Sequence, residues 1–201
     1  MTPCIVFDLE TTGLPPGRRA RDGDWHGRIV EVGAVVVTGD GWVVSPISFY
    51  VQQPERHLTC WRARPAMNVH KIPVETILRE GHPEEEAAQR LVRWVERVKE
   101  RFNVRELRAY NHPFDFWFLE QKPWQISERT GLTFGADIML VAREKLGRGR
   151  RIKLARAVER ANEQGAKIEW HSDAHRAEED ARIAAEVAVH CASLDRCRGV
   201  A

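Results

Sequence analysis

Hydrophobic residues in the first fifty positions follow patterns typical of β-strands. Ile5–Leu9 is apolar and β-prone, Ile29–Val37 is dense in valine, and Trp42–Val51 alternates apolar with polar side chains. Residues 39–41 read Gly-Asp-Gly, a hairpin-type turn, so we expect these three strands to pair in antiparallel order. The segment 14–27 is rich in proline, glycine and arginine, and it predicts a loop between the first two strands.

Hydrophobic spacing changes to a helical period beyond residue 60. Residues 65–78 predict short helices, and Pro83 begins the clearest helix, whose apolar stripe recurs at positions 91, 95, 98 and 102. We expect a short fourth strand at Glu106–Tyr110 and further helices at Asp137–Leu146, Ile152–Asn162 and, approximately, His175–Ala192. Strands followed by alternating helices and strands favour an α/β fold with one mixed sheet.

The length and composition indicate one globular domain. The chain has 201 residues, of which 43% are hydrophobic and 30% are charged, and it shows no internal repeat or linker that would divide it. We therefore expect a single domain over residues 1–201, with a core over about residues 3–192 and a short tail at 193–201.

Charge and cysteine content limit the partners and the cellular location that we expect for the protein. The net charge of +2 is too small to indicate a partner by itself, so any nucleic-acid surface must be local. The four cysteines are scattered without a C-x-x-C pair, which argues against a zinc ribbon and a disulfide scaffold. The N-terminus lacks a secretory pattern, and the longest apolar run, Val32–Val37, is too short to span a bilayer. We expect a cytoplasmic protein that does not interact with membranes.

Two carboxylates interrupt the first strand. Side chains alternate along a strand, so Asp8 and Glu10 point to one face while Phe7 and Leu9 point to the other. Two carboxylates held side by side repel each other unless a cation lies between them, and Mg²⁺ or Mn²⁺ favours such oxygen ligands. The turn at residues 11–13 offers free backbone N–H groups to a substrate. The alternative is a strand that ends in a solvent-exposed turn.

A second acid follows the fourth strand. Asp115 falls in the first turn of a predicted helix that begins just beyond the carboxyl end of that strand, the edge at which α/β sheets gather ligands. Its aromatic neighbours are expected in the core, so its carboxylate needs a partner. The alternative is an acid that only complements the helix dipole.

A histidine and a third acidic position lie near the C-terminus. Five residues span about 500° of regular helix, so His175 and Asp180 would diverge by roughly 140° if both were helical. We therefore place His175 on the segment that leads into the helix and Asp180 on its buried face. The alternative is an exposed histidine on a surface helix. Zinc binding by His171 and His175 is disfavoured because no suitable third ligand is near in sequence.

Together these motifs resemble the DEDDh class of 3′–5′ exonucleases, which belongs to the ribonuclease H-like superfamily and includes proofreading subunits of DNA polymerases. FDLETTGL (7–14), AYNHPFDFWFLE (109–120) and HRAEEDA (175–181) match the three family motifs in order, and the resemblance runs from about residue 5 to residue 189. Segments 28–35, 65–72 and 136–143 also resemble the family. The departures are the arginine-rich insert 15–27 and Tyr110, where many relatives have histidine.

The resemblance implies a ribonuclease H-like, mixed five-stranded sheet flanked by helices, and a two-metal hydrolytic site. Asp8 would bridge two divalent ions (Mg²⁺ or Mn²⁺), Glu10 and Asp180 would complete one ion site, and Asp115 would hold the second. His175 would accept the proton of the attacking water, because imidazole changes its charge near neutral pH. Four clustered carboxylates should remain partly protonated when no metal is bound.

The resemblance also implies where a nucleic acid with a free 3′ end would bind. Backbone near the first motif would grip the terminal nucleotide, and Leu14 would either wedge against its base or simply pack. The full set of predicted substrate contacts is Thr11, Thr12, Gly13, Leu14, Asn111 and Phe114. The predicted reaction is release of nucleoside 5′-monophosphates from single-stranded or frayed DNA, with RNA trimming as the close alternative.

The sequence alone does not exclude other functions, and it leaves the roles of some residues undecided. A catalytically silent nucleic-acid-binding module, or a phosphatase or nucleotidase with the same metals, would fit the same fold. A DNA polymerase or repair complex is a candidate partner. The cationic run Arg143–Arg160 could follow phosphates or form a solvated face, and Trp25 and Trp61 could stack on bases or pack internally.

Overall fold

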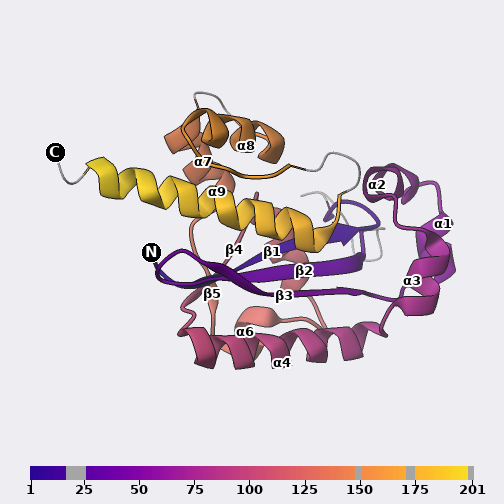
Figure 1. Cartoon of the computed structure of the whole chain (residues 1–201). Coiled ribbons are helices and arrows are strands. Elements are labelled where there is room, and N and C mark those ends of the chain that lie inside the picture. The colour runs from indigo at the N-terminus through magenta and orange to yellow at the C-terminus, as the bar shows by residue number, and fades with distance from the viewer. Residues whose placement is uncertain (17–25, 148–150, 171–174, 199–201) are drawn as a thin grey trace.

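The computed structural model describes residues 1–16, 26–147, 151–170 and 175–198, and five strands in these residues form one sheet in the order β3-β2-β1-β4-β5 (Figure 1). β1 (Cys4–Thr11) pairs antiparallel with β2 (Ile29–Val37), which pairs antiparallel with β3 (Val43–Tyr50). β4 (Glu106–Ala109) runs parallel to β1, and β5 (Thr133–Phe134) runs parallel to β4. The predicted mixed sheet with three antiparallel strands first is confirmed.

Strand periodicity divides the core into two layers. Ile5, Phe7 and Leu9 point to the face covered by α4 (Glu84–Phe102), with α5 (Pro113–Leu119) and α6 (Ile126–Thr130) beside it. Cys4 and Val6, which alternate with these residues along β1, point to the opposite face. That face is covered by α7 (Ile138–Leu146), α8 (Leu154–Glu163) and α9 (Ala177–Arg198). Figure 1 shows α9 crossing one side of the sheet and α4 lying on the other.

Three short helices lie beyond the ends of β1 and β2. They are α1 (Glu55–Thr59), α2 (Arg64–His70) and α3 (Val74–Glu80), and they form a small separate core in which Val30 of β2 packs against Leu58 and Ile77. Figure 1 places α2 beside the tip of β1 and the first turn of α9. Three distant parts of the chain therefore meet at this corner.

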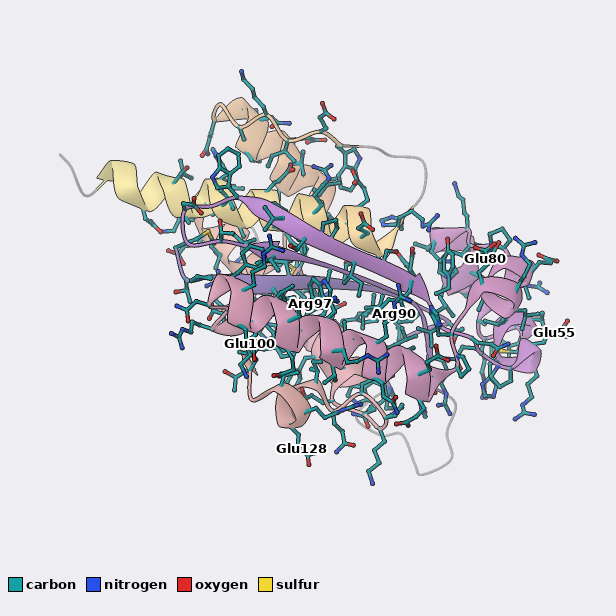
Figure 2. The ribbon with its side chains drawn as sticks, turned by 60° about the horizontal axis from the view of Figure 1, so that its bottom comes forward. Glu55, Glu80, Arg90, Arg97, Glu100 and Glu128 are labelled. Atoms are coloured by element: carbon teal, nitrogen blue, oxygen red, sulfur yellow. The ribbon has the colours of Figure 1, made fainter. Side chains whose placement is uncertain are left out.

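The long helix α4 shows how the sequence pattern selects the buried face. Leu91, Val95 and Val98 are buried, and each contributes roughly 1.5–3 kcal/mol through removal of its apolar surface from water. Arg90 and Arg97, labelled in Figure 2, come from the polar positions of the same helix. The predicted apolar stripe thus faces the sheet.

Some predicted element boundaries are wrong. The last helix, expected to end near Ala192, continues to Arg198, and Leu194 of the predicted tail packs against the core. The third strand begins at Val43, and helix α1 was not predicted. Within the described part of the chain, no helix combines the length and the apolar character needed to cross a bilayer.

Candidate active site

The end of β1 carries the first two predicted acids. In the antiparallel register with β2, Asp8 lies opposite Gly33 and Glu10 lies opposite Glu31. Both acids share the face of the sheet covered by α9, because they continue the alternation of Cys4 and Val6. Asp8 is half-buried and Glu10 is 9% exposed.

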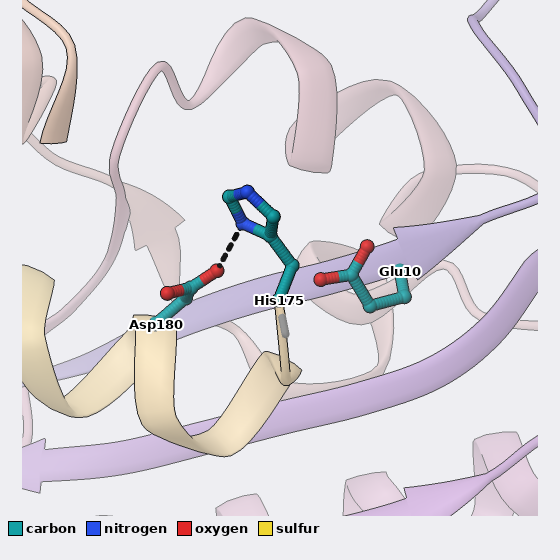
Figure 3. Close-up of side chains that lie close together, drawn as sticks. All are labelled: Glu10, His175 and Asp180. Atoms are coloured by element: carbon teal, nitrogen blue, oxygen red, sulfur yellow. Dashed lines mark hydrogen bonds and ion pairs between the residues drawn. The ribbon is translucent and has the colours of Figure 1, made fainter. Parts of the chain in front are cut away.

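Helix α9 brings the third motif to the same place (Figure 3). His175 lies just before the helix, Asp180 lies in its first turn, and their Nδ1 and Oδ2 atoms are 2.8 Å apart. One ligand atom from each of Glu10, His175 and Asp180 lies within 4.8 Å of the other two. The predicted positions of His175 on a lead-in segment and of Asp180 inside the helix are therefore as expected.

Asp115 lies on α5, which follows β4, the strand that borders β1 on the edge opposite β2. It lies in the first turn of α5 and is 2% exposed, and its carboxylate interacts with the backbone amides of Leu9 and of Asp115 itself. Its charge is the largest of the charge effects that act on Asp8. The four predicted acids thus form one electrostatic cluster.

Burial and mutual repulsion make the charged forms of these acids unfavourable. Burial, followed by the charge of Asp115, raises the pKa of Asp8 well above its ordinary value. Burial, followed by the charge of Asp180, raises the pKa of Glu10 from 4.5 to about 8. Burial also raises the pKa of Asp115 and of Asp180, although the contact with His175 opposes the shift of Asp180. The donor set of carboxylate oxygens and one imidazole suits a hard divalent cation that would neutralise this repulsion.

An ion pair between buried Glu31 and half-exposed Arg176, absent from the sequence predictions, fixes the start of α9. Glu31 is fully buried on β2, and it accepts hydrogen bonds from Arg176 at 2.9 Å and from the backbone N–H of Ala177 at 3.2 Å. Arg176 also donates to the hydroxyl of Tyr50. The hydrogen bond to Glu31, the largest cause, raises the pKa of Arg176. The pair holds the first turn of α9, and hence Asp180, beside the end of β1.

Gly33 allows α9 to approach the sheet closely at the same point. A Cβ atom at position 33 would lie 2.0 Å from the backbone carbon of Ala177. The buried small residues Ala177, Ala181 and Ala184 extend this close packing along the helix. Glycine opposite Asp8 is therefore required by the contact between helix and strand.

A cavity of about 1070 Å³ opens over the acid cluster. Its acidic end is lined by Asp8, Glu10, His175 and Asp180. Four of the predicted substrate contacts, Thr11, Gly13, Leu14 and Phe114, also line it.

Two predicted substrate contacts do not line this cavity. The hydroxyl of Thr12 accepts a hydrogen bond from the Arg28 amide at 2.9 Å. Asn111 adopts a left-handed backbone conformation, and its amide donates to Asp137 at 3.0 Å. Both contacts stabilise the strand ends that carry the acids.

Further residues near the site lay in the family-like segments of the sequence but had no predicted role. His70 of α2 is buried and lines the cavity, and burial, followed by the charge of Arg176, lowers its pKa to about 4. Asp137 caps α7 by accepting from the Met139 amide. Tyr110, which departs from the family motif that the sequence resembles, donates its hydroxyl proton to the Ile152 carbonyl at 2.7 Å.

For the tryptophans and the basic run, whose roles the sequence left undecided, the structure gives different answers. Trp61 is 74% exposed and lines the cavity, so it does not pack internally. Trp25 and His171 lie outside the described residues, as do residues 148–150 of the basic run. Five cationic residues of that run line a separate small cavity of about 300 Å³: Arg143, Arg151, Lys153, Arg156 and Arg160.

A mixed sheet whose central strand ends in paired acids, beside the first turn of the last helix, is the arrangement that the resemblance to ribonuclease H-like exonucleases predicts. A family model described as Exonuclease (RNase_T) matches residues 5–188. The chain therefore belongs to this exonuclease family, and the prediction of a DEDDh-type 3′–5′ exonuclease is confirmed at the level of the family.

Solved structures of Exonuclease I have a similar fold. The E. coli enzyme in complex with a dT13 oligonucleotide is 17% identical, with a TM-score of 0.64, and the match covers 100% of this chain and 42% of that one. The Methylocaldum szegediense enzyme is 16% identical, with a TM-score of 0.61 and coverage of 94% and 40%. The chain thus spans less than half the length of these proteins. No curated protein sequence matches it.

Proposed function

We propose that this chain hydrolyses phosphodiester bonds at the 3′ end of single-stranded or frayed DNA and releases nucleoside 5′-monophosphates. The observation that supports this function is the meeting of Glu10, His175 and Asp180 within 4.8 Å, with Asp8 and Asp115 in the same electrostatic cluster. Asp8 and Glu10 come from β1, Asp115 from α5, and His175 and Asp180 from the start of α9 and the residues just before it. Burying so many acids together is unfavourable without a bound cation.

Asp8, Glu10, Asp115 and Asp180 would hold two divalent ions, Mg²⁺ or Mn²⁺. Such ions neutralise the charge that develops on the phosphate and the leaving oxygen, and they favour ionisation of the attacking water. The low polarity around the buried carboxylates strengthens these interactions. The protein's own contribution is to keep the four acids fixed on rigid elements, α9 being held by the pair of Glu31 and Arg176.

His175 is suited to accept a proton from the attacking water. When Asp180 is ionised it can only accept hydrogen bonds, so the Nδ1 atom of His175 carries the proton between them. The Nε2 atom then has a free lone pair, and the half-exposed ring can present it to water in the cavity.

The size of the cavity leaves room for a substrate longer than one nucleotide. Its volume of about 1070 Å³ lies at the upper limit of the roughly 300–1,000 Å³ typical of pockets for small molecules. Leu14 and Phe114 border the acidic residues and would contact the terminal base. We favour DNA because the similar E. coli Exonuclease I was solved with a dT13 oligonucleotide. A DNA polymerase or repair complex is the proposed partner.

The test is a gel assay of 5′-labelled oligonucleotides. DNA and RNA of one sequence, single-stranded or with recessed 3′ ends, are incubated with Mg²⁺, Mn²⁺ or a chelator beside an Asp8→Ala control. We expect stepwise shortening of single-stranded DNA that requires metal and disappears in the control. Faster shortening of RNA would favour the exoribonuclease. Binding without shortening would favour the silent module, and equal turnover of a mononucleotide ester would favour the phosphatase.

A further inference from the structure

Apolar, solvent-exposed side chains also line the cavity that opens over the acids. Among the described residues, six large hydrophobic side chains are strongly exposed, and three of them, Leu14, Trp61 and Val69, line this one cavity. Pro15 and Pro65 extend the same wall. Exposed apolar side chains that gather in one place mark a binding surface, whereas scattered ones need no explanation.

Trp61 is the largest side chain of this wall. It follows α1 and precedes α2, and it is 74% exposed, although a tryptophan usually gains stability by burial. The guanidinium carbon of Arg62 lies 5.2 Å from the centre of its ring, and Arg62 lines the cavity too. An exposed indole beside a cation is the combination with which proteins hold unpaired nucleic acid, since the ring stacks on a base and the cation attracts the phosphate.

The position of this pair relative to the acids follows from the fold. Helix α2, which begins directly after this turn, lies beside the tip of β1 in Figure 1. The acids occupy the end of the cavity formed by β1 and α9, and Trp61 occupies the wall formed by the α1–α2 turn. A strand whose terminal phosphodiester lies over the acids would therefore extend along the apolar wall.

We infer that Trp61 and Arg62 form a second subsite, which stacks the base next to the 3′-terminal nucleotide and binds its phosphate. The inference rests on the proposed function and deepens it. A base stacked on Trp61 must leave its neighbours in a duplex, so the subsite selects a strand with at least two unpaired nucleotides at its 3′ end.

The test compares two substrates in steady-state kinetics. The methyl ester of thymidine 5′-monophosphate fills only the terminal position, whereas a single-stranded thymidine octanucleotide also reaches the subsite. Trp61→Ala should raise KM for the octanucleotide by roughly 5- to 150-fold and leave kinetics on the ester unchanged. Trp61→Phe, which keeps an aromatic ring, should recover most of the loss. Trp42→Ala is the matched control, since Trp42 is 70% exposed but does not line the cavity.

Each outcome decides a different question. Unchanged octanucleotide kinetics for Trp61→Ala, or equal losses on both substrates, would overturn the stacking subsite while the nuclease assignment stands. Wild-type protein inactive on both substrates would overturn the proposed function and the subsite with it. Retained turnover of the ester by Trp61→Ala would show that the variant is folded.

Discussion

Replacement of Glu10 by glutamine tests whether burial and charge repulsion in the acid cluster destabilise the folded protein. Burial and the charge of Asp180 raise the pKa of Glu10 from 4.5 to about 8. Because the pKa of the folded state is the higher one, the contribution of Glu10 to stability is complete below pH 4.5 and is lost as the pH rises through about 8. At pH 7.5 this loss amounts to roughly 4 kcal/mol, and at pH 5.5 to roughly 1 kcal/mol.

Glu10→Gln should therefore be more stable than the wild type in a chelator, and increasingly so as the pH rises. For a chain of this length 1 kcal/mol corresponds to roughly 2–4 °C, so we expect the Tm to rise by about 10 °C at pH 7.5 and by about 3 °C at pH 5.5. The measurement is thermal unfolding followed by circular dichroism. The control is Glu100→Gln, an exposed acid on α4 labelled in Figure 2, which should leave Tm almost unchanged.

Divalent metal should make the wild type more stable than Glu10→Gln. Mn²⁺ should raise the Tm of the wild type, more at pH 7.5 than at pH 5.5, because bound metal must displace protons from the carboxyls. Glu10→Gln should gain much less, since it lacks one charged ligand. A variant that is less stable than the wild type in chelator at pH 7.5, or a Tm difference independent of pH, would refute the electrostatic account.

Three further substitutions test the parts of the site separately. His175→Ala should lower kcat by roughly 10²–10⁴-fold in the oligonucleotide gel assay, and a variant with full rate would exclude the proposed proton transfer. Glu31→Gln should lower the free energy of unfolding in urea by about 1–3 kcal/mol, because the hydrogen bonds from Arg176 to a fully buried side chain weaken, and activity should fall with it; unchanged stability would contradict the role of this pair. Gly33→Ala should displace α9 and abolish cleavage, as the new Cβ would lie 2.0 Å from the backbone of Ala177. Gly39→Ala, with neighbours no closer than 3.6 Å, is its control, and equal effects of the two would argue against the close packing.

The residues that the sequence placed well are those governed by local periodicity. Alternation along a strand is enough to put Asp8 and Glu10 on one face, and helical spacing is enough to separate His175 from Asp180. The structure brings these residues together, as the motifs led us to expect. Their roles in metal binding and catalysis remain predictions.

Features that depend on long-range contacts could not be read from the sequence. Glu31 appears there as one acid within a valine-rich strand, and its partner Arg176 is 145 positions away. β5 has only two residues and α1 only five, so neither carries a recognisable period. The continuation of α9 to Arg198 follows from packing of residues such as Leu194, which local pattern does not reveal.

Two elements far apart in the sequence supply the two halves of the acid cluster, Glu10 from β1 and Asp180 from α9. During synthesis, a ribosome therefore exposes the first half long before the second exists. A nascent or C-terminally truncated chain would lack the complete set of ligands, whatever part of the sheet had already formed. This order of assembly would leave the proposed metal site incomplete until α9 has docked on β2.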